Sequence, residues 1–398
     1  MFAPNPFLLM SVLFMLLAAL AAVDTAATSL GLTTAFNGLR WIRVHLITLG
    51  ILAETVFGLA PMMIAVRSGL PRPGARWDIW LALNGGLVML FVGIPLVNGV
   101  LIAVGGALIL GATVLLLGQI RAIGICPTAG GRVLYLLGLT FLLVGVTIGT
   151  GLWIGWAEPL RIAVPLETHI HANVFGFLAM TMAGLLIDIV PVFTGRRSPE
   201  SLRVGPMAWL MGCGATLLVI APWTGIMQLN LVGILLHLSG TIWVLLTVVT
   251  MVRGAADGWT AGSLHLVTGY VWFLAPLFVA PLVITGVVGE GAEAIEQSAP
   301  QALIFGWAAQ ISYALGPGLL RWLLLPGEKP RLGGSYVTLI AAHLGGVSIW
   351  ASILTAPLRA PLYALAYTFW GIALLMILAE AWGILARAGR EGREAVLA

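Results

Sequence analysis

Long apolar runs, separated by short polar or Gly/Pro-rich breaks, make up almost the whole chain. A bilayer core about 30 Å thick needs about 20 apolar residues per helix, and twelve runs meet that requirement. They cover residues 7–27, 44–66, 79–97, 100–120, 133–154, 169–192, 207–223, 228–251, 264–286, 302–322, 336–357 and 361–386. Because no basic residue precedes Phe7, we read the first run as a retained helix and not as a signal peptide. The pattern predicts an all-α integral membrane protein with twelve transmembrane helices.

Composition excludes several classes of protein. Charged residues are 9% of the 398 and hydrophobic residues 60%, whereas a soluble domain carries roughly 25% charged residues. A net charge of +4 from scattered arginines offers no basic stripe for nucleic acid. Cys126 and Cys213 stand far apart, without the spacing of a disulfide framework or a zinc site. No Walker loop, nucleophile elbow or dinucleotide fingerprint is present, so the lipid bilayer is the first partner that the sequence predicts.

The basic residues predict the orientation of the chain, since cytoplasmic loops carry the excess of Lys and Arg. Fifteen of the nineteen lie in the loops after even-numbered runs or in the C-terminal tail. The other four are Arg40, Arg43, Arg161 and Arg359. This distribution places both termini in the cytoplasm. The acidic stretch 289–296 then lies outside, where we expect a solvated loop.

The second, sixth and tenth runs share a pattern that suggests an internal repeat. A His or Gln at the outer end is followed five residues later by a glycine, which allows close packing against the helix backbone. The pairs are His45 and Gly50, His171 and Gly176, and Gln301 and Gly306. The spacing predicts one polytopic domain over 1–398, built of four-helix units at about 1–128, 129–256 and 257–398. Glycine is 50 of the 398 residues, so chance matching is the alternative.

All six histidines lie within or at the ends of apolar runs, and none lies in a polar loop. An ionisable group inside a membrane is costly and suggests a functional site, and neutral imidazole is a common haem and metal ligand. The alternative is a histidine that donates a hydrogen bond across a helix interface. His265, at the cytoplasmic end of its run, fits an interfacial residue as well as a ligand. The candidate cofactor ligands are His45, His169, His171, His237 and His343. All of them except His343 lie in the outer half of the helix bundle, and these four are also the candidate metal ligands.

Position along the helix limits how two of these histidines can act. Residues i and i+2 of a helix point about 200° apart. His169 and His171 therefore share a metal only if His169 lies in non-helical backbone. Otherwise they serve different sites, or one is a ligand and the other its hydrogen-bonding partner.

Carboxylates inside the apolar runs are the other ionisable candidates. Glu54 lies nine residues after His45 in the second run, and Asp188 lies near the inner end of the sixth. Each suits a proton relay or a buried structural hydrogen bond.

The residues around His171 resemble a known family. The run from His169-Ile-His171 through Phe175-Gly-Phe177 and Ala183-Gly to Pro191-Val-Phe-Thr-Gly195-Arg196 is similar to the NnrS family, over about 30 residues. The helix count and repeat resemble, more distantly, subunit I of the haem-copper oxidases and nitric oxide reductases. The resemblance implies an oxidase-like bundle, haem with copper as a further metal, and a role in nitric oxide metabolism.

The chain also departs from the oxidase pattern. Oxidase subunit I has paired histidines on helix 10 and adjacent histidines on helix 7, whereas here the tenth run has Gln301 and Gln310 and the seventh has no histidine. A standard oxygen-reducing binuclear centre is therefore not expected. His45 matches the low-spin haem ligand of the oxidases, and His171 lies on the helix that supplies a copper ligand there.

The sequence thus predicts a membrane haem protein of the bacterial-type inner membrane that handles electrons or a diatomic gas such as nitric oxide, with a redox partner protein. The cofactor is haem b, bound by His45 and His171, because a CxxCH motif for covalent haem is absent. Two other functions remain open. One is a proton-coupled transporter that uses Glu54, Asp188 and the histidines; the other is a membrane anchor subunit of a larger redox complex.

Overall fold

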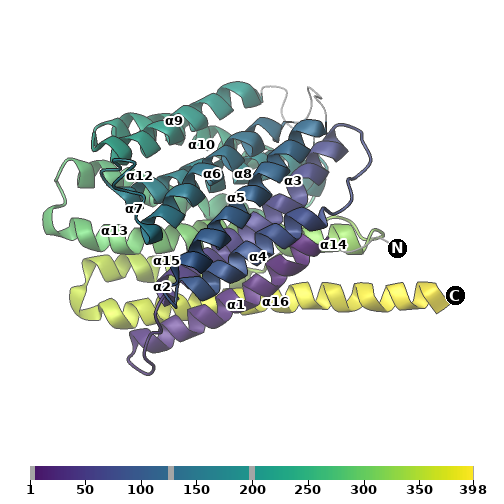
Figure 1. Cartoon of the computed structure of the whole chain (residues 1–398). Coiled ribbons are helices and arrows are strands. Elements are labelled where there is room, and N and C mark those ends of the chain that lie inside the picture. The colour runs from purple at the N-terminus through teal and green to yellow at the C-terminus, as the bar shows by residue number, and fades with distance from the viewer. Residues whose placement is uncertain (1–4, 124–129, 197–201, 398) are drawn as a thin grey trace. The chain divides into compact units, whose positions relative to one another are not determined.

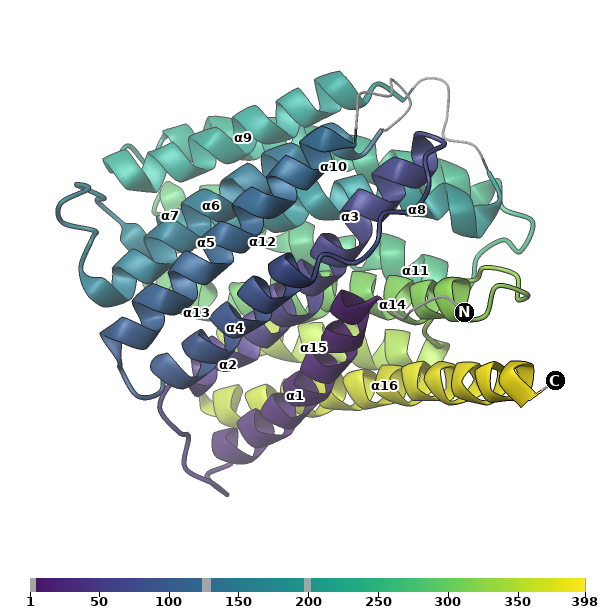
Figure 2. The same cartoon turned by 45° about the vertical axis from the view of Figure 1, so that its right-hand side comes forward.

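The computed structural model describes residues 5–123, 130–196 and 202–397, and these residues form helices and connecting turns with no strand. Figures 1 and 2 show the helices from two directions. The elements are α1 (Pro6–Ser29), α2 (Leu39–His45), η1 (Leu46–Ala53), α3 (Glu54–Arg67), α4 (Trp77–Gly93), α5 (Gly99–Ala122), α6 (Arg132–Ile154), α7 (Pro165–His171), η2 (Ala172–Leu178), α8 (Ala179–Thr194), α9 (Val204–Thr224), α10 (Leu229–Arg253), α11 (Ala261–Thr268), α12 (Tyr270–Ile284), η3 (Gly289–Gly291), α13 (Ala292–Gln301), η4 (Ala302–Ala308), α14 (Ala309–Leu324), α15 (Tyr336–Leu354), η5 (Ala356–Leu358) and α16 (Arg359–Leu397).

Each predicted apolar run lies in a helix. Among the described residues, eleven helices are long and apolar enough to cross a membrane, and α4 is a shorter apolar helix. The chain therefore has the architecture of an integral membrane helical bundle. The loop predicted for 289–296 is wrong, because Gly289–Gly291 form the short helix η3 and α13 begins at Ala292. Glu293 and Glu296 are nonetheless exposed on this helix, which explains why an acidic segment can be helical there.

Burial separates the helices into two classes. The spans Leu39–Arg67, Pro165–Thr194 and Ala292–Leu324 have 89%, 94% and 94% of their apolar windows buried, whereas the other spans have 56% or less. These three are the second, sixth and tenth helices, where the repeated pattern lies. The others expose large apolar side chains, such as Leu20, Trp209 and Trp382, as helices that face lipid acyl chains do.

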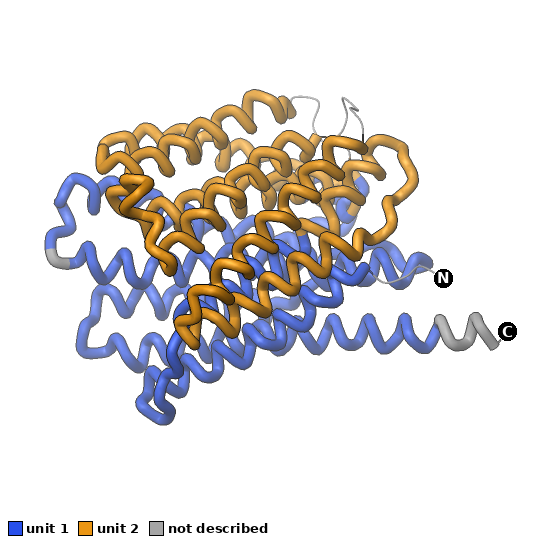
Figure 3. The backbone as a smooth tube through the Cα atoms, in the orientation of Figure 1, with its two compact units in different colours: residues 1–55, 193–195, 252–398 blue, residues 56–192, 196–251 orange. Residues whose placement is uncertain are grey.

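The chain forms two compact units (Figure 3). Unit 1 consists of residues 1–55, 193–195 and 252–398, and unit 2 of residues 56–192 and 196–251. In unit 1, α1 packs against α16 and η1, while α15 packs against α16 and η4. In unit 2, α5 packs against α4 and α6, and α6 packs in turn against η2 and α7.

The three most buried spans share a local distortion. Each contains a π-helical segment, and these segments begin at Leu46, Ala172 and Ala302, directly after His45, His171 and Gln301. The widened π-helical turn is rare and occurs often at functional sites. Hydroxyl groups bond to carbonyls of these segments: Ser11 and Thr55 donate to Ile51, and Thr181 donates to Phe177.

A glycine in each π-helical segment packs against an aromatic side chain of the preceding span. Gly50 faces Phe14, Gly176 faces Phe141 and Gly306 faces Trp272. A Cβ atom would lie 2.6 Å from the ring of Phe14 at Gly50 and 2.6 Å from that of Trp272 at Gly306, and closer still to Phe141 at Gly176. Only glycine fits at these three positions without movement of the neighbouring helix.

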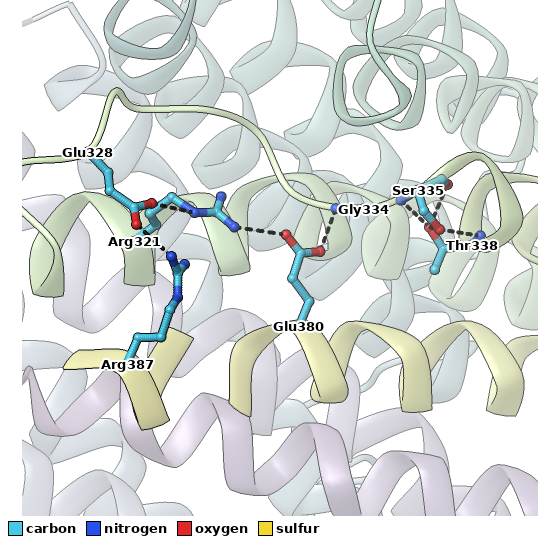
Figure 4. A network of polar contacts seen from close by, with 7 residues as sticks. All are labelled: Arg321, Glu328, Gly334, Ser335, Thr338, Glu380 and Arg387. Carbon is cyan, nitrogen blue, oxygen red and sulfur yellow. Dashed lines mark hydrogen bonds and ion pairs between the residues drawn. The ribbon is translucent and has the colours of Figure 1, made fainter. Parts of the chain in front are cut away.

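An ion-pair network connects three parts of unit 1 (Figure 4). Arg321 on α14 is 4% exposed and donates to Glu380 of α16, with Nη2 and Oε1 3.2 Å apart. Its Nε atom lies 3.4 Å from Glu328, which also accepts from Arg387. Glu380 accepts from the Gly334 amide at 3.0 Å. The network therefore holds the connection between α14 and α15 against α16.

Candidate functional site

The imidazole of His45 in unit 1 is half-buried, and it contacts Trp41 of the same helix, α2. Its ring stacks on Trp41 with centroids 4.0 Å apart and planes inclined by 14°. Nδ1 lies 2.8 Å from the Trp41 carbonyl oxygen. A carbonyl oxygen can only accept, so Nδ1 carries the proton and Nε2 is the acceptor nitrogen.

His169 and His171 of unit 2 face different helices. Nδ1 of His169 lies 2.8 Å from the Gly145 carbonyl oxygen on α6, and its ring packs on Gly149. Nδ1 of His171 lies 2.6 Å from the Leu218 carbonyl oxygen on α9. Both residues are in the helix α7, as the prediction of different sites requires. In both imidazoles the proton is on Nδ1, and Nε2 is the acceptor.

His237 binds the π-helical segment of unit 2. It is fully buried, and Nε2 lies 3.0 Å from the carbonyl oxygen of Phe175 in η2. Thr241 lies 3.2 Å from Nδ1. The Phe175 ring is 5.4 Å from the His171 ring and 5.4 Å from the His237 ring. His237 therefore satisfies a carbonyl of the distorted turn that follows His171.

In His343 of unit 1, both ring nitrogens bond to side chains. Trp272 donates from Nε1 to Nδ1 at 3.0 Å, so the proton of the neutral ring lies on Nε2. That nitrogen is 2.8 Å from the Thr268 hydroxyl, which donates in turn to the Leu264 carbonyl. The geometry defines one tautomer in which each nitrogen has a protein partner.

In His265, as in His343, both ring nitrogens bond to side chains, and the sequence did not indicate these partners. It is fully buried on α11, with Nδ1 3.0 Å from Gln310 Oε1 and Nε2 2.9 Å from the Thr338 hydroxyl. Its ring meets the Tyr313 ring edge-on, with centroids 5.8 Å apart. Gln310 and Thr338 lie inside apolar runs, and polar residues at such positions were the available signal.

The two candidate relay carboxylates are fully buried. Glu54 opens α3, directly after η1. Asp188 on α8 lies 3.5 Å from Nε of Arg67, and it accepts from the Tyr135 hydroxyl at 3.0 Å and from the Gly131 amide at 3.2 Å. Asp188 therefore joins α3, α6 and α8 of unit 2 through a fully bonded carboxylate.

The described residues contain no group of three or more His, Cys, Asp and Glu side chains placed to hold a metal ion. Cys213 is a free cysteine, and Cys126 lies outside the described residues. In His45, His169 and His171 a backbone carbonyl oxygen accepts from Nδ1, and in His237, His265 and His343 both ring nitrogens lie within hydrogen-bond distance of a polar group.

Comparison with known proteins does not assign the chain to a family. No protein-family model matches the chain, and no curated protein matches it significantly.

Proposed function

We propose that the protein is an integral membrane haem protein in which Nε2 of His171, in unit 2, and Nε2 of His45, in unit 1, would each hold haem iron. One observation carries the proposal: each histidine precedes a π-helical segment directly, and a carbonyl oxygen holds the proton on its Nδ1. A histidine that binds a metal through Nε2 almost always donates its other ring N–H to such a partner, because this bond fixes the tautomer and the orientation of the ring.

His171 fits an iron atom better than the histidines with two protein partners. It is half-buried, and no hydrogen bond to its Nε2 is present among the described residues. An iron atom at Nε2 would displace no protein hydrogen bond there. At His343, by contrast, ligation would break a hydrogen bond at either nitrogen. A haem needs only one or two such ligands, so its ligation does not depend on a group of three metal-binding side chains. Copper remains a further candidate metal.

The proposal includes three four-helix units in an oxidase-like bundle. The starts of the π-helical segments, at Leu46, Ala172 and Ala302, repeat the spacing of the sequence pattern. The contact between a glycine and an aromatic ring of the preceding span also recurs in all three segments. Two independent local features at the same three places support a common origin of the units.

Haem would supply an iron atom that changes oxidation state and binds diatomic gases. The proposed role is electron transfer, or the handling of a gas such as nitric oxide with a redox partner protein. The chain's contribution is a fixed imidazole orientation at His45 and at His171.

An optical spectrum of the purified protein tests the proposal. After haem-replete expression we expect a Soret band, with haem b identified as its pyridine adduct. His171→Ala and His45→Ala should each lower the haem content or change the ligand field. The matched controls are His237→Gln and His343→Gln, which should leave the spectrum unchanged. A wild-type protein that carries no Soret band would overturn the proposal.

A proton-coupled transporter is the second candidate, because Asp188 is a buried carboxylate bonded to Arg67 and Tyr135. This function predicts transport by metal-free protein, and Asp188→Asn should then abolish transport without any spectral change. The third candidate, an anchor subunit of a redox complex, predicts co-purification of a soluble subunit in a fixed ratio.

A further inference from the structure

Two neighbouring uncharged polar groups of α14 have no hydrogen-bond partner among the described residues. They are Nε2 of Gln310 and the hydroxyl of Tyr313, and both residues are 0% exposed. Residues three apart lie on the same side of a helix, so the two groups share one region of unit 1. Buried polar atoms without partners are rare, and an ordered water molecule is the usual reason for them.

The same region contains His265, which contacts both residues. Gln310 Oε1 accepts from Nδ1 of His265, and the Tyr313 ring packs on the imidazole edge-on. The other titratable neighbour is His343 of α15, whose Nε2 lies 2.8 Å from the hydroxyl of Thr268 on the same helix as His265. Two charged groups are connected to this region through Gly334: Glu380 accepts from the Gly334 amide and binds Arg321, and a Cβ atom on Gly334 would lie 2.8 Å from the His265 ring.

Thr338 allows His265 to gain and lose a proton without losing a partner. A hydroxyl group both donates and accepts. When Nε2 is bare, the Thr338 hydroxyl donates to it across 2.9 Å. When Nε2 is protonated, the same oxygen accepts from it, and the hydroxyl turns to the Ser335 carbonyl oxygen 2.7 Å away.

Ser335 connects this pair to the surface of unit 1. It is half-buried at the start of α15, and its hydroxyl lies 3.4 Å from that of Thr338. Figure 4 shows Ser335 and Thr338 beside Gly334, next to the ion-pair network of Arg321 and Glu380. Two hydroxyl groups thus lead from a half-exposed turn to a fully buried imidazole.

We propose that unit 1 contains a hydrated polar site, formed by His265, Gln310, Tyr313 and Thr338, that binds water and exchanges protons with the surface through Ser335. The ligand is water, held by Gln310 Nε2 and the Tyr313 hydroxyl. In the exchange a proton reaches Nε2 of His265 from the Thr338 side, and the imidazolium later returns a proton the same way, so no other reactant is consumed. The site uses neither of the histidines proposed as haem ligands.

Hydroxyl-radical footprinting with synchrotron X-rays tests the water on the wild-type protein, because radicals formed from bound water modify adjacent buried side chains. Tyr135 and Tyr367 are matched controls: both are 0% exposed, and their hydroxyls donate to Asp188 and Gln301. We expect Tyr313 to be modified several-fold faster than either control. Equal rates for the three tyrosines would overturn the water site.

Hydrogen–deuterium exchange at the imidazole C2 position, followed by mass spectrometry over a range of pH, tests the proton exchange. His237 is the matched control, since it is equally buried and bonds to Thr241, which is itself 2% exposed. We expect faster exchange at His265 than at His237, slowing in Thr338→Val and recovery in Thr338→Ser. Equal exchange at the two wild-type histidines would overturn the proton path, even if Thr338→Val did not fold. Neither measurement requires haem, so its outcome is independent of the haem spectrum.

Discussion

Replacement of Gly176 by alanine should destabilise unit 2, because the new methyl group has no room. Gly176 lies in η2, and its Cβ position overlaps Cβ and Cγ of Phe141 on α6. These atoms are fixed to the backbone of α6 and cannot swing away as the end of a long side chain could, so the two helices must separate. Overpacking of this kind costs about 1–3 kcal/mol.

The gain in helix propensity opposes this cost. Alanine is favoured over glycine in a helix interior by about 1 kcal/mol. The expected net change for Gly176→Ala is therefore a loss of about 0–2 kcal/mol in the free energy of unfolding, against a gain of about 1 kcal/mol for an alanine that meets no neighbour. Equilibrium unfolding in mixed detergent micelles, followed by circular dichroism, measures this quantity.

Two further variants distinguish the clash from a general effect of alanine. Gly118 on α5 has no atom within 4 Å of its Cβ position, so Gly118→Ala should be neutral or stabilising. In a Phe141→Gly background, which removes both overlapping atoms, the cost of Gly176→Ala should be smaller, because the two changes couple only if the side chains touch. A Gly176→Ala protein that is stabilised as much as the Gly118→Ala protein would refute the packing argument.

Three other outcomes follow from the structure. Tyr135→Phe should lower the free energy of unfolding by about 1–2 kcal/mol, because buried Asp188 loses a donor; an unchanged thermal midpoint would contradict this. Glu380→Ala leaves Arg321 without one of its two carboxylates and should cost about 1–3 kcal/mol, since the pair is partly exposed; limited proteolysis should then cleave 325–335 faster, and equal cleavage would argue against the network. A green fluorescent protein fused after residue 398 should fluoresce and an alkaline phosphatase fusion there should be inactive, and the opposite pattern would reverse the predicted orientation.

Some features of this protein can be predicted from the order of the residues along the chain alone. The apolar runs predicted all the long helices, because the length of apolar sequence needed to cross a bilayer does not depend on which helices are neighbours. The residues that head the π-helical segments, His45, His171 and Gln301, were also found from spacing alone. The run boundaries were less accurate: the helix before His45 begins at Leu39, since backbone hydrogen bonds continue past Arg40 and Arg43 although the apolar run does not.

Other features depend on residues distant in the sequence. Nothing near His171 indicates that its proton lies on Nδ1, because the carbonyl that decides this belongs to Leu218, 47 residues away. The sequence left His265 as either an interfacial residue or a ligand and did not indicate its partners Gln310 and Thr338, which come from two other helices 45 and 73 residues on. The sequence by itself therefore determined that histidines would lie among apolar helices and where the repeated positions fall. Only the tertiary structure decided which ring nitrogens bond to protein groups, because a hydrogen bond needs a partner within about 3 Å and only folding brings these groups that close.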